Sequence, residues 1–402
     1  MIITNSNPSY LANLYATHSG LGDLPYVEQK AVLDSDFFAW ADSWSVALAP
    51  LGYCTSEITP NAVSLQSAWC RENGVTFDSS HSGLRNIVLA QARQFCPDII
   101  WFNDYDDELL KILRSELPSL RLVLGWVGSA IPQTEVWHMM DLILSCAPES
   151  VAALSKTGFP AVHFPHSFDC RINDRLEPRA KNMSLSFVGS LMRQSQFHLR
   201  REELLEVLAS TVPLEIFTPS AEFGWQEEVK GIVKLGLTFG VSALRALGAS
   251  DSFLKTLPII GGAADWSPQY VRPVNPHLKP YLRPSAFGLN MYQVLRNSAA
   301  TLNIHADSSS QFASNMRLYE ATGVAACLLT DWKQNIEDIF VPDQEVVVYN
   351  NAEECREKAM WLLEHPKEAA EIGQAGQRRT LREYTFGHRA ELLHRIVRKA
   401  LL

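Results

Sequence analysis

The feature that most constrains this chain is an alternation of short β-rich runs and helical segments along its 402 residues. In the first half, the runs 98–102 (DIIWF) and 121–125 (RLVLG) follow a segment, 84–96, whose apolar residues recur at helical spacing. Strands that alternate with helices in this way build parallel sheets covered by helices. The sequence therefore predicts an α/β fold.

The second half repeats the pattern. Strands are predicted at 301–304 (TLNI), 325–330 (AACLLT) and 345–349 (EVVVY), and helices at 315–322 and 353–364. A chain of this length is too long for one ordinary core and suits two domains. We therefore expect two Rossmann-like domains, one in each half.

A change in composition marks the boundary between the halves. Residues 165–182 hold two prolines, mixed charges and little periodicity, which is typical of a linker. We predict an N-terminal domain at 1–170, a C-terminal domain at 171–384 and a last helix within 385–402. This last helix is expected to cross back and pack on the first domain.

Charge and cysteine content disfavour several classes of protein. The formal net charge of −9 argues against a general nucleic-acid-binding protein, which needs a basic surface. The seven cysteines are scattered without a C-x-x-C pair, which disfavours a disulfide framework and a zinc site and predicts a reducing compartment. The first residues, MIITNSNPSY, lack the pattern of a signal peptide, so we expect a cytoplasmic location.

The most apolar stretch, 231–248, is interrupted by Lys234 and Arg245 and does not read as a membrane span. Two interpretations stay open. The stretch is either a largely buried helix pair or a helix that lies on a membrane surface. The second interpretation predicts peripheral contact with the inner face of the membrane.

A glycine follows the predicted strand 184–188. Gly189 and Ser190 precede a basic segment that includes Arg193 and Arg201. Glycine lets a ligand approach the backbone closely, and arginine makes charge-assisted hydrogen bonds to phosphate. The loop is therefore either a phosphate site, with Gly189, Ser190 and Arg193 near the ligand, or a plain turn.

The predicted helix 315–322 is a second candidate. Ser314 or Asn315 suits its N-cap and the glycine that follows suits its C-cap. Its N-terminus would then face the crevice above the strand ends, where open α/β sheets bind ligands. Arg317 and Glu320 lie on one face, at i and i+3. They are either an ordinary ion pair or the partners of a phosphate and a ribose, respectively.

The sequence of 301–390 closely resembles the C-terminal lobe of bacterial group-1-like glycosyltransferases, of the CgeB-like branch. Further blocks look like corresponding parts of the same enzymes: NAVSLQSAWCRENG (61–74), FCPDIIWFND (95–104), PHSFD (165–169), the FVGS loop and GLNMYQVLRNSAATLNIH (288–305). The resemblance therefore extends over most of the chain.

This resemblance implies a GT-B fold, in which two Rossmann-like domains face a central cleft. It implies a nucleotide-diphosphate sugar donor held mainly by the second domain, with no essential metal and no other cofactor. Glu320 matches a glutamate that holds the nucleotide ribose, and basic residues near Gly189 would hold the diphosphate. Many retaining relatives carry another glutamate where this chain has Phe312, so the stereochemistry of transfer is not inherited.

Such a reaction needs charge stabilisation and a proton acceptor. Without a metal, arginines and helix N-termini must stabilise the departing diphosphate, a role that we assign to Arg193 and Arg317. Asp104 is the candidate base for an acceptor hydroxyl if the enzyme inverts; if it retains, the leaving phosphate would take the proton. Asp104 and Asp106 are alternatively carboxylates that favour a helix start, or a metal-binding D-x-D pattern that belongs to a different fold.

Three residues are candidates for the acceptor side: His18, in a loop with two glycines, and Trp126 and Ser129, in GWVGSAIP. His166, in the linker, is a candidate for contact with the donor. Each has a structural alternative, such as an irregular loop for His18 or packing for Trp126. Glycan, lipid-linked and protein acceptors all suit this type of enzyme, and no sequence feature specifies an oligomeric state.

Two other functions stay open beside a glycosyltransferase. A sugar-nucleotide epimerase of the same fold would also bind a nucleotide diphosphate between two domains, and a catalytically silent relative would bind a nucleotide sugar without turnover. A NAD-dependent dehydrogenase is disfavoured, because neither MIITNSNPSY nor FVGSLMRQ contains the pattern G-x-G-x-x-G. The sequence thus predicts transfer of a sugar from a nucleotide-diphosphate sugar to an acceptor.

Overall fold

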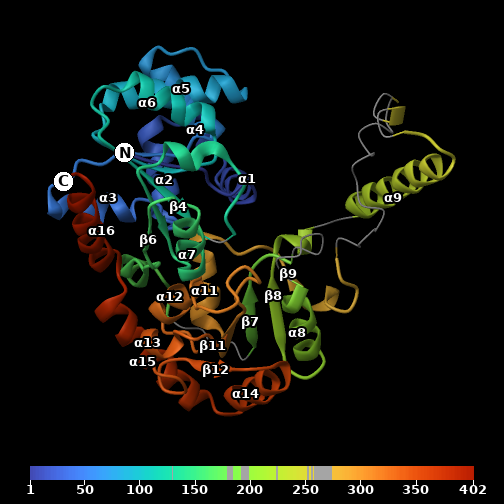
Figure 1. The fold of residues 1–402 in the computed structure, drawn as a ribbon. Helices are drawn as coiled ribbons and strands as arrows, with labels where there is room; N and C mark the ends of the chain where they lie inside the picture. Colours follow the sequence, from blue (N-terminus) through green and yellow to red (C-terminus); the bar gives the residue numbers. More distant parts are fainter. Residues whose placement is uncertain are drawn as a thin grey trace. The chain divides into compact units, whose positions relative to one another are not determined.

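The computed structural model describes residues 1–128, 130–178, 184–191, 199–222, 225–250, 253–254, 257 and 274–402. Within these ranges the strands form two six-stranded sheets (Figure 1), with the orders β2-β1-β3-β4-β5-β6 and β12-β11-β10-β7-β8-β9. The strand pairs with a defined register are parallel in both sheets. The predicted α/β fold with two Rossmann-like sheets is confirmed.

The first sheet and its helices come from the N-terminal part of the chain. Its strands are β1 (Ile2–Thr4), β2 (Glu57–Ile58), β3 (Ile99–Asn103), β4 (Leu122–Val127), β5 (Leu142–Ser145) and β6 (Ala161–His163). The helices between them are α1 (Pro8–Thr17), α2 (Tyr26–Ser35), α3 (Ser43–Leu48), α4 (Val63–Asn73), α5 (His81–Phe95), α6 (Asp107–Glu116) and α7 (Pro148–Lys156).

The second sheet follows along the chain. Its strands are β7 (Leu185–Val188), β8 (Leu214–Phe217), β9 (Leu282–Arg283), β10 (Ala300–Asn303), β11 (Leu328–Asp331) and β12 (Val347–Tyr349). The helices of this part are α8 (Leu199–Ala209), α9 (Trp225–Ala246), α11 (Gly288–Asn297), α12 (Arg317–Gly323), α13 (Ile336–Ile339), α14 (Ala352–Glu364) and α15 (Pro366–Glu383), and α16 (Phe386–Ala400) ends the chain.

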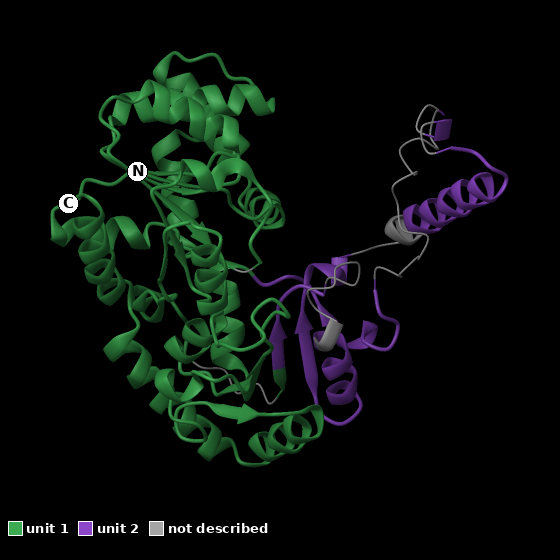
Figure 2. Ribbon diagram, in the orientation of Figure 1, with its two compact units in different colours: residues 1–185, 287–402 green, residues 186–286 purple. Residues whose placement is uncertain are grey.

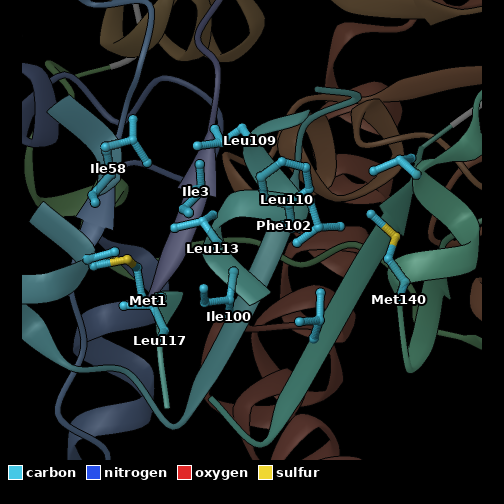
Figure 3. Close-up of a cluster of buried hydrophobic side chains, with 14 of the residues drawn as sticks. Met1, Ile3, Ile58, Ile100, Phe102, Leu109, Leu110, Leu113, Leu117 and Met140 are labelled. Carbon is cyan, nitrogen blue, oxygen red and sulfur yellow. The ribbon is translucent and has the colours of Figure 1, made fainter. Parts of the chain in front are cut away.

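Alternation along β3 places side chains on both faces of the first sheet, because successive residues of a strand point to opposite sides. Ile100 and Phe102 join one core, together with Ile3 and with Leu110 and Leu113 of α6 (Figure 3). Each fully buried leucine in such a core contributes about 1.5–3 kcal/mol to stability. Both faces are apolar, as a parallel sheet covered by helices requires.

The opposite face of the first sheet packs on the last helix, α16. Phe386, Leu393 and Val397 of α16 share a core with Trp44 of α3 and Trp101 of β3. The helix starts with a capping box, in which the Thr385 side chain accepts from the N3 backbone. The prediction that the C-terminal helix returns to the first sheet is therefore confirmed.

The chain divides into two compact units (Figure 2). Residues 1–185 and 287–402 form the first unit, and residues 186–286 form the second. The first unit thus contains the whole first sheet together with β10, β11 and β12. The domain boundaries inferred from the sequence, at residues 170 and 384, stay a prediction.

Candidate functional site

Arg317 and Glu320 of α12 form an ion pair in the structure. Arg317 Nη1 lies 3.0 Å from Glu320 Oε2, and only 15% and 10% of the two side chains are exposed. The same guanidinium nitrogen also lies 3.1 Å from the sulfur of Met291 in α11. An exposed pair of this kind contributes little to stability, but burial removes both charges from water and has a cost. The pair is therefore not an ordinary surface ion pair.

Tyr292 of α11 adds a hydroxyl to the surroundings of this pair. Burial raises the pKa of Tyr292 well above its usual value, and the negative charge of Glu320 raises it further. The phenol therefore stays protonated and able to donate a hydrogen bond. Tyr292 was not among the residues predicted from the sequence, because a tyrosine on an amphipathic helix gives no signal beyond burial.

The predicted N-cap of this helix is wrong. The helix begins at Arg317 with Met316 as N-cap, and no side chain caps it. The Asn315 amide instead donates from Nδ2 to Oδ1 of Asn303 at 2.6 Å, at the end of β10. Asn303 in turn donates to Thr330 Oγ1 at 2.9 Å, so that Asn315 belongs to a polar network at the strand ends.

The predicted C-cap at Gly323 is also wrong, since the helix ends at Gly323 and Val324 is its C-cap. Gly323 has a different reason to be glycine. A Cβ atom there would lie 2.4 Å from the ring of Phe168. The backbone oxygen of Gly323 accepts from Asn173 Nδ2 at 3.0 Å and from Gln377 Nε2 at 2.9 Å. The end of α12 is thus held by close packing.

His166 and Trp126 lie together in a buried aromatic region. Their rings are 5.3 Å apart in an edge-to-face arrangement, and both line a small cavity with Met316, the residue before α12. Burial and, to a smaller extent, the charge of Arg389 lower the pKa of His166 to about 3. His166 is therefore neutral at physiological pH. Its position next to Met316 brings the linker close to the start of α12.

Asp104 lies just after the carboxyl end of β3. Its Oδ2 accepts from Asn5 Nδ2 at 2.8 Å, and its Oδ1 accepts from Tyr105 N at 2.6 Å. Burial raises the pKa of Asp104 above the usual value. The capping role belongs to Asp106, which accepts from Leu109 N at 3.0 Å at the start of α6. The role of Asp104 as a general base stays a prediction.

His18 is exposed and ends α1, where its Nδ1 lies 3.0 Å from the backbone oxygen of Leu14. The structure places it near Asp36, a residue not predicted from the sequence. Burial raises the pKa of Asp36, and hydrogen bonds from Leu289 N and Tyr10, followed by the charge of His18, offset part of this rise. Asp36 Oδ1 accepts from Leu289 N at 3.2 Å. Asp36 thus joins the end of α2 to the start of α11, and His18 lies within electrostatic range of Asp36.

The glycine loop belongs to the second unit. Gly189 N donates to the backbone oxygen of Phe217 at 3.0 Å, and Arg201 Nη1 donates to the backbone oxygen of Ser190 at 2.9 Å. Arg201 also lies over the ring of Phe187, 5.4 Å from its centre. The loop thus has an arginine fixed against it. The predicted residues Arg193 and Ser129 lie outside the described residues.

The described residues contain neither a cluster of metal ligands nor a membrane-spanning helix. Among them, no three histidines, cysteines, aspartates or glutamates are grouped so that they could hold a metal ion. Across the same ranges, every helix is too short or too polar to span a bilayer.

Comparison with known proteins identifies the type of domain. Residues 238–395 match the family model described as "Glycosyl transferase-like". No curated protein sequence matches the chain significantly.

Solved structures show the same fold. Anabaena HepE in complex with UDP has a TM-score of 0.53 at 10% identity, over 99% of this chain and 99% of that chain. A glycosyltransferase from Rickettsia africae has a TM-score of 0.52 at 8% identity, over 100% of this chain and 98% of that chain. Anabaena HepE in complex with UDP-glucose has a TM-score of 0.50 at 12% identity, over 83% of this chain and 88% of that chain.

At these identities the structural likeness shows the fold, and the family match covers the part of the chain that contains α12. The CgeB-like branch stays a prediction. With a glycosyl transferase-like domain at residues 238–395 and a two-sheet GT-B fold, this chain is an enzyme of the glycosyltransferase class.

Proposed function

We propose that this enzyme transfers a sugar from a nucleotide-diphosphate sugar to a hydroxyl group of a glycan, a lipid-linked or a protein acceptor, without a metal ion. The observation that supports it most is the buried pair of Arg317 and Glu320, 3.0 Å apart at the start of α12. A nucleotide diphosphate presents charged phosphate oxygens and ribose hydroxyl groups. Arg317 supplies a cation for the phosphate, and Glu320 supplies an acceptor for the hydroxyl groups.

The donor nucleotide lies over the carboxyl ends of the second sheet in this proposal, as ligands do in open α/β sheets. Glu320 accepts hydrogen bonds from the ribose, and Arg317 exchanges part of its contact with Glu320 for a phosphate oxygen. Gly189 and Ser190 contribute backbone groups to the diphosphate, and Asn315 orients the loop before α12. The HepE structures contain UDP or UDP-glucose, so uridine nucleotides are the first to test.

In the reaction the acceptor oxygen bonds to the anomeric carbon, and the bond from that carbon to the diphosphate oxygen breaks. The electron pair leaves with the diphosphate, where Arg317 and Arg193 stabilise its charge. In an inverting enzyme Asp104 takes the proton of the acceptor hydroxyl. In a retaining enzyme the leaving phosphate takes it. His18 and Trp126 lie on the acceptor side, and His166 contacts the donor.

Helix α9 carries an exposed apolar stripe that suits peripheral contact with a membrane. On one face of α9, Val241 packs against Leu254. On another face four apolar side chains are exposed: Val229, Ile232, Val233 and Phe239. Their spacing places them along one side of the helix, because residues three and four apart are neighbours.

The charge of this helix favours an anionic bilayer as the partner of the stripe. Helix α9 contains three basic residues, Lys230, Lys234 and Arg245, against two acidic ones, Glu227 and Glu228, so its net charge is +1 in a chain whose net charge is −9. A helix with basic and apolar faces binds in the headgroup region of anionic membranes. Such contact would keep a cytoplasmic enzyme at the inner face of the membrane, within reach of a lipid-linked acceptor.

A panel of nucleotide sugars tests the function. UDP, GDP, dTDP and CDP are first compared by thermal shift, because a ligand of the folded state raises the melting temperature. The wild-type enzyme is then incubated with glucose conjugates of the nucleotides that bind, and the products are separated. Free nucleotide diphosphate with transferred or hydrolysed sugar supports the proposal. A changed sugar still on the nucleotide identifies an epimerase, and binding without turnover identifies a silent relative; either result contradicts it.

A further inference from the structure

A cavity of about 510 Å³ lies in the first unit, at the amino ends of β1, β3 and β4. Residues at the starts of these strands line it, among them Ile2, Ile99 and Arg121, together with residues of α16 and of the turn after α3. Helices α3 and α16 pack side by side at this edge of the sheet (Figure 1). Small-molecule sites in proteins have volumes of about 300–1,000 Å³. The cavity is therefore large enough for a small ligand.

The cavity is at the opposite edge of the first sheet from the proposed catalytic site. Ile99, which lines the cavity, is the first residue of β3, whereas Asp104 follows the last residue of the same strand. At about 3.3 Å per residue, these two positions are about 16 Å apart along the strand. Donor and acceptor lie at the carboxyl ends of the strands in the proposed function. A ligand in the cavity would therefore occupy a separate site.

The inner wall of the cavity is apolar. It consists of side chains from four elements, which are Leu48 of α3, Trp101 of β3, Leu124 of β4, and Leu393 and Val397 of α16. All five belong to one buried core, and none is more than 5% exposed. An apolar group that lies against this wall loses contact with water, which favours binding. The wall therefore favours a ligand with an apolar chain.

The rim of the cavity carries exposed arginines. Arg121 lines the cavity, and Arg398 is close enough to the lining residue Tyr53 to lower its pKa, against the larger effect of burial. Within the part of the chain that the structure describes, no carboxylate forms an ion pair with either arginine, although Asp98 lies on the same rim. Arg398 also complements the dipole of α16, in whose last turn it lies, but Arg121 precedes a strand. Arg121 is therefore available to an anion.

An apolar wall beside these arginines matches a ligand with one apolar chain and one anionic head group. We propose that the cavity binds a single-chain amphipathic anion of the fatty-acid class, with its chain along Leu124, Leu393 and Val397 and its carboxylate at Arg121. A guanidinium group can donate two parallel hydrogen bonds to a carboxylate, and Arg398 adds positive charge nearby. The whole chain has a net charge of −9, so this local positive charge is needed to attract an anion. The inference goes beyond the proposed function and does not depend on it.

Protection of cysteines locates the ligand in the wild-type protein, with dodecanoate as the probe. Cys54 and Cys96 are exposed and line the cavity, whereas Cys170 is exposed and does not line it. The protein is alkylated with iodoacetamide, with and without dodecanoate below its micelle concentration, and mass spectrometry follows each cysteine. At about ten times the Kd, dodecanoate should slow alkylation of Cys54 and Cys96 at least about fivefold, because about nine tenths of the protein is then occupied. Alkylation of Cys170 should not change.

Titration calorimetry compares dodecanoate with dodecanol, which has the same chain without the charge. Arg121→Gln should weaken binding of dodecanoate about 3- to 10-fold and binding of dodecanol less than about twofold, because it removes only the partner of the carboxylate. Ile99→Trp enlarges a side chain that lines the cavity and should weaken binding of both ligands at least about fivefold. Arg378→Gln, at an exposed arginine of α15 that does not line the cavity, is the control and should change neither Kd.

The absence of saturable binding of dodecanoate would overturn the proposal, as would binding that leaves alkylation of Cys54 and Cys96 unchanged. Equal weakening in Arg121→Gln and Arg378→Gln would also overturn it, because net charge alone would then attract the ligand. Dodecanoate should raise the melting temperature of the wild-type protein, and a decrease would mean that it binds the unfolded chain instead. If Ile99→Trp does not fold, Arg121→Gln and the protection of the cysteines decide. Failure of the site leaves the proposed function intact, since donor binding is measured separately.

Discussion

Arg317 and Glu320 face each other across one turn of α12, with 3.0 Å between Nη1 and Oε2 and with both side chains largely buried. The pair lies beside Met291 and Tyr292 of α11 and follows the polar network of Asn303 and Asn315. In the proposed function this carboxylate and this guanidinium exchange part of their mutual contact for the donor nucleotide.

We expect Glu320→Ala to weaken binding of the donor nucleotide about 10- to 100-fold, because it removes a charged acceptor for the ribose. Arg317→Ala should lower turnover by about 10²- to 10³-fold, more than it weakens nucleotide binding, because charge on the diphosphate develops in the transition state. Calorimetry and initial rates measure the two effects. Glu337→Ala, at an exposed glutamate of α13, is the control. Wild-type affinity and turnover in both test variants would contradict the assignment.

Gly323→Ala should destabilise the protein. Alanine is the better helix former, but its Cβ would lie 2.4 Å from the ring of Phe168, and overpacking of this kind costs about 1–3 kcal/mol. We therefore expect a lower melting temperature. Gly236→Ala in α9 is the matched control. Apart from its chain neighbours and the backbone of its own helix, no described atom lies within 4 Å of the added Cβ, and helix propensity should stabilise the variant by about 0.5–1 kcal/mol. Equal melting temperatures for the two variants would show that the contact with Phe168 relaxes freely.

The activity of an inverting enzyme should depend on the ionisation of Asp104. Burial raises the pKa of this carboxyl group, so it loses its proton at a higher pH than an ordinary aspartate. Only the ionised form is a base; turnover should therefore fall as the pH falls through this raised pKa. Asp104→Asn should lower turnover about 10²- to 10⁴-fold and remove this acidic limb, in a profile of rate against pH. Asp107→Asn, at an exposed residue of α6, should keep the wild-type profile. An unchanged limb in Asp104→Asn would exclude Asp104 as the base.

The apolar stripe of α9 should bind anionic bilayers. Ile232 and Phe239 are 60% and 62% exposed, and a carboxylate at either position would oppose burial among lipids. We expect the wild-type chain to sediment with vesicles of phosphatidylglycerol and phosphatidylcholine, and less so at high salt. Ile232→Asp and Phe239→Asp should lose most of this binding. Ser242→Asp adds the same charge at an exposed position off the stripe, and should lose clearly less. Equal loss in all three variants would mean that net charge alone determines binding.

Turnover should persist after metal ions are removed. If Arg317 and Arg193 stabilise the leaving diphosphate, EDTA should change the initial rate less than about twofold, because no metal takes part in charge stabilisation. Rates with EDTA, and with Mg²⁺ or Mn²⁺ added back, check this. Loss of activity with EDTA that either ion restores would contradict a metal-independent reaction.

The spacing of apolar residues along the chain changes repeatedly from that of a strand to that of a helix. This pattern determined the fold class, the two sheets and most of their strands, because the spacing in a strand or a helix depends on local geometry and burial alone. The return of α16 to the first sheet was also predicted, because a last helix rich in arginine and leucine can cross back in a two-lobed fold; the structure adds that Phe386, Leu393 and Val397 make the contact. The positions of Arg317 and Glu320 on one helix face needed only their spacing of three residues.

Only the tertiary structure decided which partners those residues have. The cap predicted at Asn315 failed, because Asn303, twelve positions earlier, competes for the same side chain. Glu149 reaches the loop at Gln311, and Asp36 reaches Leu289, across separations of more than a hundred residues. Contacts of this kind leave no periodic trace in a sequence, since they depend on how whole elements pack. The sequence therefore determined the elements and their chemistry, and folding determined which of these groups meet.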